Sequence, residues 1–71
     1  MGNKNVDARG LSCPQPVILA RKAIEEDEFP VEVWVDSVTS RENVRRMAEM
    51  NHCQVQIEES GDEFHIILHK A

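Results

Sequence analysis

Apolar and polar residues alternate in four stretches of the chain, which is the pattern of half-buried β-strands. The positions expected to face a core are Val6 and Ala8, then Val31, Val33 and Val35, then Cys53, Val55 and Ile57, and finally Phe64, Ile66 and Leu68. Ser60-Gly61-Asp62 separates the last two stretches and predicts a β-hairpin. The four stretches together predict a sheet that turns one face to a hydrophobic core.

Helical spacing of apolar residues predicts a first amphipathic helix of about three turns, which ends near Asp27 and Glu28. Its buried face carries Val17, Ala20, Ala23 and Ile24, and its outer face carries Arg21, Lys22, Glu25 and Glu26. Pro14 suits the first position of this helix, with Cys13 as the cap residue. A later start at Pro16 is the alternative, because a residue before proline, here Gln15, is pushed out of helical geometry.

A second helix is predicted after the strand that ends at Asp36. Thr39 and Glu42 have the three-residue spacing of a capping box, and Asn51 is a candidate left-handed stop. The buried stripe of this helix is Val44, Met47 and Ala48. We interpret Met47 and Met50 as core filler, and His52 as a polar residue that ends the helix.

The element order β-α-β-α-β-β predicts an α+β fold of two layers, a mixed four-stranded sheet with both helices on one face. The whole chain, residues 1–71, is expected to form a single domain. The other face of the sheet should meet water, where Trp34 and Ile67 would form an exposed apolar patch. Such a patch suits a partner or dimer surface. The alternative is that Trp34 is simply a good strand former on the surface.

Length and charge restrict what this chain can do. A net charge of −5 disfavours direct binding to nucleic acid, and no apolar run is long enough to span a membrane. The two cysteines, with no apolar targeting segment, predict a reduced, cytoplasmic protein. A chain of this size buries only about 60% of its unfolded surface. We therefore expect no cofactor and no pocket of cofactor size, so that a partner must complete any reaction.

Cys13 is the candidate for chemistry. Gly10 supplies a tight turn before it, and Pro14 and Pro16 stiffen the chain after it. The positive end of a helix dipole favours thiolate, which is the nucleophilic form of cysteine. The alternative is a buried cysteine that behaves as a small apolar residue.

Other polar and exposed residues offer weaker candidates. Ile18 is expected on the outer side of the first helix, either as a partner contact or as an isolated exposed apolar residue. Arg21 and Lys22 would attract an acidic partner surface, or are simply solvated. No metal site is expected, because the chain has no C-x-x-C pair and His65 and His69 would lie about 13 Å apart on one strand. Cys53 is expected to be buried, inert and too far from Cys13 for a disulfide.

The run V-D-A-R-G-L-S-C-P-Q-P-V resembles the signature of the TusA/SirA-like sulfur carriers, in which a Cys-Pro-x-Pro motif opens the first helix. The resemblance covers nearly all of the chain and implies the sheet order 1-2-4-3, with the last strand antiparallel to the others. It implies that Cys13 is the catalytic residue, framed by Gly10, Pro14 and Pro16. Asp7 and Arg9 also match, either as an ion pair that holds the turn or as partner contacts.

The function that this resemblance implies is a sulfurtransferase-type carrier. It would accept persulfide sulfur from a cysteine desulfurase or another donor and relay it to an acceptor protein, in tRNA thiolation, molybdenum cofactor assembly or selenium metabolism. The S-R-E-N-V start of the second helix is more similar to the YedF branch, linked with selenium metabolism, than to TusA itself. The competing hypothesis is a non-catalytic interaction or regulatory module that binds through the Trp34/Ile67 sheet face.

Overall fold

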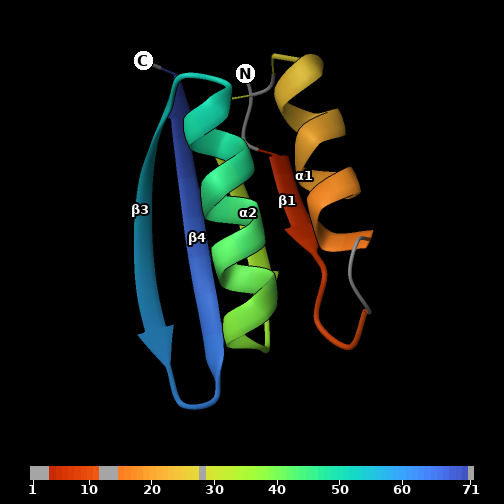
Figure 1. Ribbon diagram of the computed structural model, residues 1–71, viewed down its shortest axis with the longest axis vertical. Coiled ribbons are helices and arrows are strands. Elements are labelled where there is room, and N and C mark those ends of the chain that lie inside the picture. Colours follow the sequence, from red (N-terminus) through yellow and green to blue (C-terminus); the bar gives the residue numbers. More distant parts are fainter. Residues whose placement is uncertain (1–3, 12–14, 28, 71) are drawn as a thin grey trace.

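The computed structural model describes residues 4–11, 15–27 and 29–70, and it confirms the predicted α+β fold. Two helices pack side by side on one face of a four-stranded sheet (Figure 1). The elements in chain order are β1 (Lys4–Asp7), α1 (Gln15–Glu25), β2 (Val31–Val35), α2 (Val38–Met50), β3 (Cys53–Ser60) and β4 (Glu63–Lys70). The strand order is β1-β2-β4-β3, as the resemblance implied.

Strand β2 forms the centre of the sheet together with β4. It runs parallel to β1 and antiparallel to β4, and β3 is antiparallel to β4 as well. Val31, Val33 and Val35 are completely buried and alternate with half-buried Glu32 and Trp34. Because neighbouring side chains on a strand point to opposite faces, Trp34 lies on the face away from the helices.

Helix α1 begins at Gln15, between the two starts that the prolines predicted. Ala20 and Ala23 are buried, and Val17 and Ile24 are half-buried against the core. Small side chains at the contact let the helix backbone approach the sheet closely. Beyond the last helical turn, Asp27 adopts a left-handed conformation with φ of 58°. The buried face of α1 is therefore the one that the sequence predicts.

Helix α2 starts two residues earlier than the predicted capping box, so the assignment of Thr39 as cap was wrong. Ser37 is the cap residue, and its hydroxyl oxygen accepts a hydrogen bond of 3.1 Å from the Ser40 amide. Glu42 lies five residues after this cap, outside capping-box spacing, and its carboxylate binds Arg45 at 2.6 Å. The residues that α2 buries are Ser40, Val44 and Ala48, with Met47 half-buried.

The end of α2 also differs from the prediction. Asn51 is the C-cap with φ of −100°, so it is not the left-handed stop that we expected. It instead closes the helix through its side chain, whose amide Nδ2 donates to the Met47 carbonyl at 2.8 Å. His52 takes the left-handed conformation, with φ of 63°, and turns the chain into β3.

The core lies between the sheet and the helices, as the alternation predicted. Ile66 and Leu68 of β4 are completely buried beside the β2 valines, and Val44 and Ala48 close the core from α2. Gly61, with φ of 62°, forms the hairpin turn between β3 and β4. Neither helix in the described part of the chain is long and apolar enough to cross a membrane.

Candidate functional site

Cys13 and Pro14 lie outside the described residues, so the site is built from the two segments that flank them. Leu11 ends the described part on one side and packs against the core. Gln15 begins α1 on the other side and is exposed, whereas Pro16, the next residue, is completely buried. The sequence between Leu11 and Gln15 is therefore a link of three residues between two anchored segments.

The turn that precedes this link is fixed to the end of β2. The Ala8 amide donates to the Trp34 carbonyl at 2.8 Å, and the Gly10 amide donates to Asp36 Oδ2 at 3.0 Å. Gly10 has φ of 78°, a left-handed conformation that confirms the predicted glycine turn. The turn residues are therefore held by the strand beside them and by Asp36 immediately after it.

Arg9 clamps the same turn from outside. Its guanidinium makes two hydrogen bonds of 2.9 Å to the Asp7 carboxylate and one of 3.1 Å to Glu63 on β4. It also lies over the Trp34 indole, 5.7 Å from the ring centroid. The hydrogen bonds from Arg9 lower the pKa of Asp7 to about 2, and the same two carboxylates raise the pKa of Arg9. The ion pair expected between Asp7 and Arg9 is present, and it extends across the sheet to β4.

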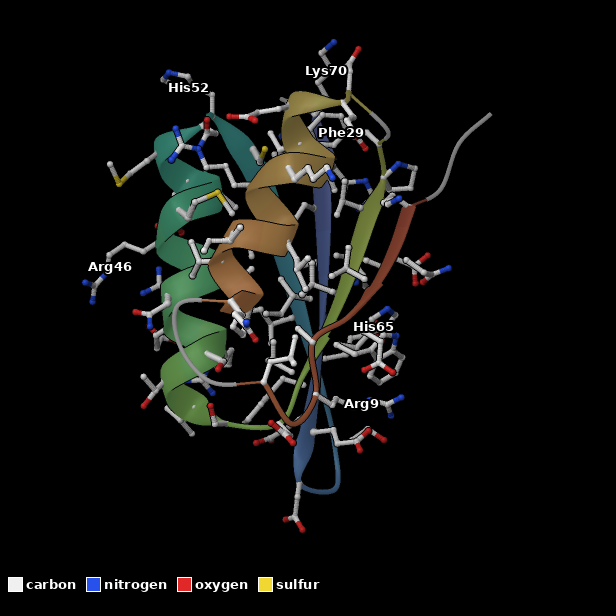
Figure 2. The ribbon with its side chains drawn as sticks, turned by 90° about the vertical axis from the view of Figure 1, so that its right-hand side faces the viewer. Arg9, Phe29, Arg46, His52, His65 and Lys70 are labelled. Carbon is white, nitrogen blue, oxygen red and sulfur yellow. The ribbon has the colours of Figure 1, made fainter. Side chains whose placement is uncertain are left out.

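The open face of the sheet is not the apolar patch that we expected. Trp34 and Ile67 are both half-buried. The His65 ring stacks on Trp34 at a centroid distance of 4.1 Å, and His65 Nε2 lies 2.7 Å from Glu32 Oε1. Figure 2 shows Arg9 and His65 together on this side of the molecule. Aromatic stacking and ion pairing therefore occupy the surface around Trp34.

The four candidate partner contacts do not form one surface. Ile18 is 56% exposed, and Arg21 and Lys22 are exposed beside it on α1. Arg21 pairs with Glu25 at 3.3 Å, a solvent-exposed contact that contributes little stability. Arg9, by contrast, is engaged with Trp34 and Glu63 on the opposite layer of the fold. Only the three residues of α1 remain together as a candidate contact surface.

Cys53 is buried at the start of β3, as predicted, and burial raises the pKa of its thiol. Its sulfur lies 3.8 Å from the Asn51 carbonyl oxygen. The strand register places Cys53 opposite Lys70, at the end of the sheet where β1 begins. The Gly10 turn follows the other end of β1. Among the described residues no group of three or more His, Cys, Asp or Glu side chains is arranged to hold a metal ion.

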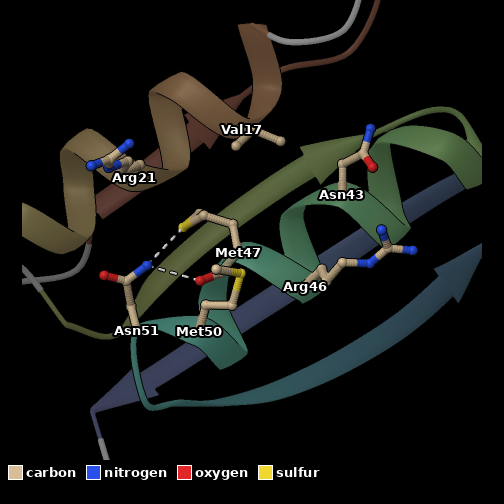
Figure 3. A pocket seen from close by; sticks show the side chains of 7 residues that line it. All are labelled: Val17, Arg21, Asn43, Arg46, Met47, Met50 and Asn51. Atoms are coloured by element: carbon tan, nitrogen blue, oxygen red, sulfur yellow. Dashed lines mark hydrogen bonds between the residues drawn. The ribbon is translucent and has the colours of Figure 1, made fainter.

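The sequence did not predict a groove that lies between the two helices. The groove has a volume of about 610 Å³ and is lined by Val17, Arg21, Asn43, Arg46, Met47, Met50 and Asn51 (Figure 3). Met50 is 76% exposed, so it is not core filler. The sequence signal was present in Met47 and Met50, which are spaced at i and i+3 on one helix face.

Comparison with known proteins places this architecture in a family. The family model described as Sulfurtransferase TusA matches residues 4–70. A protein of Methanocaldococcus jannaschii, provisionally named a sulfur carrier protein, is 37% identical over 70 residues, which cover 94% of this chain and 93% of that protein. The crystal structure of a SirA-like protein from Desulfitobacterium hafniense superposes with a TM-score of 0.81 at 35% identity, covering 94% of this chain and 97% of the other. The chain therefore belongs to the TusA family of sulfurtransferases.

Proposed function

We propose that this protein carries sulfur as a persulfide on Cys13 and transfers it between two larger proteins. The observation that carries the proposal is the anchoring of the chain on both sides of Cys13. The turn at Gly10 is bonded to the end of β2, and Pro16 is buried two residues after Pro14. Gly10 and Pro16 therefore fix the two described segments that flank Cys13 to the sheet and the core.

The transfer is a thiol exchange that needs no cofactor. The Cys13 thiolate attacks the terminal sulfur of a donor persulfide; the donor S–S bond breaks and a new S–S bond forms on Cys13. The donor leaves as a thiolate, so one S–S bond replaces another and no external oxidant or reductant is consumed. An acceptor nucleophile then takes the terminal sulfur in the same way and releases the Cys13 thiolate.

Two features of the chain suit this chemistry. Helix α1 begins two residues after Cys13, and a helix N-terminus favours the thiolate that must attack. The other cysteine, Cys53, is buried at the end of the sheet where β1 begins, whereas the Gly10 turn follows the other end of β1, and burial raises the pKa of the Cys53 thiol. A second reactive thiol close to Cys13 would attack the persulfide and release sulfide. The burial of Cys53 therefore protects a persulfide on Cys13 from this side reaction.

The partners follow from the same chemistry. The donor is a cysteine desulfurase or another persulfide-bearing protein, and the acceptor is a downstream protein of tRNA thiolation, molybdenum cofactor assembly or selenium metabolism in the cytoplasm. The exposed α1 residues Ile18, Arg21 and Lys22 lie within three helical turns of Cys13 in sequence, and they offer contacts to such partners. Arg9 acts through the turn instead, since its guanidinium already binds two carboxylates.

Mass spectrometry of the intact protein tests the proposal after incubation with a cysteine desulfurase and cysteine. We expect a gain of about 32 Da, one sulfur atom, in the wild type and in Trp34→Ala, and no gain in Cys13→Ala. An unmodified wild type, or an equal gain in Cys13→Ala, would reject Cys13 as the carrier. If no adduct forms and Trp34→Ala loses binding to a partner, the interaction-module hypothesis is the better one.

A further inference from the structure

The residues that line the groove between α1 and α2 have no role in the sulfur-transfer step described above. Its apolar lining comes from Val17 of α1 with Met47 and Met50 of α2. Methionine side chains are flexible and polarisable, and exposed methionines are typical of surfaces that adapt to a bound segment. A hollow of about 610 Å³ is large enough to hold several side chains of such a segment.

The charge of the groove is opposite to that of the whole protein. Arg21 and Arg46 are its charged lining residues, contributed by α1 and α2, and among the described residues no carboxylate lines it. The chain as a whole carries a net charge of −5. Figure 3 shows Arg21 on the α1 side and Arg46 on the α2 side, with Met47 between the two helices. A cationic, apolar groove on an acidic protein selects for an acidic, apolar ligand.

Contacts within the domain hold two of the groove residues. Asn51 at the C-cap donates through Nδ2 to the Met47 carbonyl and to the Met47 sulfur at 3.5 Å, which orients the Met47 side chain. Arg21 pairs with Glu25, which is 62% exposed, and this solvent-screened contact is easily exchanged for another carboxylate. The carboxylates of Glu42 and Glu49 are held by Arg45 and do not line the groove.

We propose that this groove binds a short apolar segment with acidic side chains, supplied by a partner protein in sulfur transfer. Val17 is the third residue of α1, so the groove starts one helical turn from the Cys13 link. A segment seated there brings its parent protein against the end of the domain that carries the thiol. The inference rests on the proposed function for the identity of the partner, but the binding preference follows from the groove alone.

Defined peptides test the binding preference. Three fluorescein-labelled peptides are titrated with the protein and followed by fluorescence anisotropy: one alternates leucine and glutamate pairs, one replaces glutamate with lysine, and one replaces leucine with serine. We expect binding of the leucine–glutamate peptide only, with amide NMR shifts gathered at Val17, Met47 and Met50. Equal binding of the lysine peptide, no binding of the leucine–glutamate peptide, or shifts on the open sheet face would overturn the proposal.

Charge reversals provide the matched control. Arg46→Glu combined with Arg21→Glu should weaken binding of the leucine–glutamate peptide at least about tenfold. Lys70→Glu reverses one charge on β4, outside the groove, and it should change binding by less than about twofold. If Lys70→Glu weakens binding as much as Arg21→Glu alone, the net charge of the protein explains the result and the groove does not.

The outcome is separable from the proposed function. Inorganic polysulfide loads a reactive thiol without any protein docking, so the Arg21→Glu/Arg46→Glu protein should still gain sulfur on Cys13. Sulfur loading without peptide binding in the wild type would reject the groove and leave the carrier proposal standing. Peptide binding by a wild type that takes up no sulfur would reject the carrier proposal and leave the groove.

Discussion

The indole ring of Trp34 lies parallel to the imidazole of His65, with ring centroids 4.1 Å apart and planes within 5°. The two residues are direct partners across β2 and β4. Glu32 Oε1 lies 2.7 Å from Nε2 of the same imidazole, and Arg9 lies over the indole. The open sheet face is therefore organised around one stacked pair, which links the turn before Cys13 to the sheet.

This pair should be measurable in a double-mutant cycle of Trp34→Ala and His65→Ala. Stacked aromatic pairs contribute about 0.5–1.5 kcal/mol beyond the area they bury. We expect a coupling of that size in the free energy of unfolding, measured by urea denaturation. Unfolding is followed by circular dichroism, because Trp34→Ala removes the tryptophan fluorescence and His65→Ala disturbs it. Strict additivity of the two substitutions would show that the stack contributes nothing to stability.

The glycine turns provide a prediction that separates stability from function. Gly10 and Gly61 both have left-handed backbone conformations, and a Cβ added to either meets no atom within 4 Å. Substitution by alanine should therefore cost about 1–2 kcal/mol at each position through backbone strain alone. Thermal unfolding should show similar losses for the two variants.

Only one of the two glycine variants should affect sulfur transfer. Gly10 precedes Cys13 and is bonded to Asp36, whereas Gly61 lies in the β3–β4 hairpin. The rate of Cys13 loading, followed by stopped-time mass spectrometry, should fall for Gly10→Ala and stay near the wild-type rate for Gly61→Ala. Equal rates for both variants would mean that the turn does not position the thiol.

The Asp7–Arg9 ion pair predicts a pH dependence of stability. The pKa of Asp7 is about 2 in the folded protein against an ordinary value of 3.8, so the unfolded chain binds more protons between these values. The contribution of the ion pair to the free energy of unfolding is complete above pH 3.8 and is lost as the pH falls through about 2. Both side chains are exposed, so the effect is small.

Denaturation of wild type and Asp7→Asn from pH 5 to pH 2 isolates this contribution. The stability difference between the two proteins should be largest at the upper end and should narrow toward pH 2, where Asp7 becomes protonated. A difference that widens as the pH falls would have the wrong sign for a carboxylate held in its charged form.

Burial predicts opposite results for two isoleucines. Ile66 is completely buried in the core, so Ile66→Ala should cost about 2–5 kcal/mol through lost burial and the cavity that remains. Ile18 is 56% exposed on α1, and Ile18→Ala should change stability by less than about 0.5 kcal/mol. Urea denaturation measures both, and similar losses at the two positions would contradict the burial that the structure assigns to them.

Alternating apolar positions predicted the strands and the face that each turns to the core. Val31, Val33 and Val35 have a single consistent inward face, and a one-residue shift in register would turn them away from the core. The start of the second helix was predicted less well. The capping-box spacing of Thr39 and Glu42 pointed to Thr39, but Ser37 is the cap and the Glu42 carboxylate binds Arg45.

The parts of the site that could not be predicted depend on contacts between distant segments. Arg9 and Glu63 are 54 positions apart, and only the strand order brings them together. The groove likewise depends on how far apart α1 and α2 lie, and the pattern of apolar residues within one helix does not predict that distance. Sequence alone identified Arg9 and Arg21 as candidates, whereas the structure assigns Arg9 to the turn and Arg21 to the groove.

The most direct test of the central claim is the location of the transferred sulfur. Protein loaded by a cysteine desulfurase with ³⁴S-labelled cysteine is alkylated, digested and analysed by tandem mass spectrometry, so that the peptide with Cys13 is read separately from the peptide with Cys53. The label should appear on Cys13 and leave it when an acceptor thiol is added. Label on Cys53, or label that no acceptor thiol removes, would contradict the account.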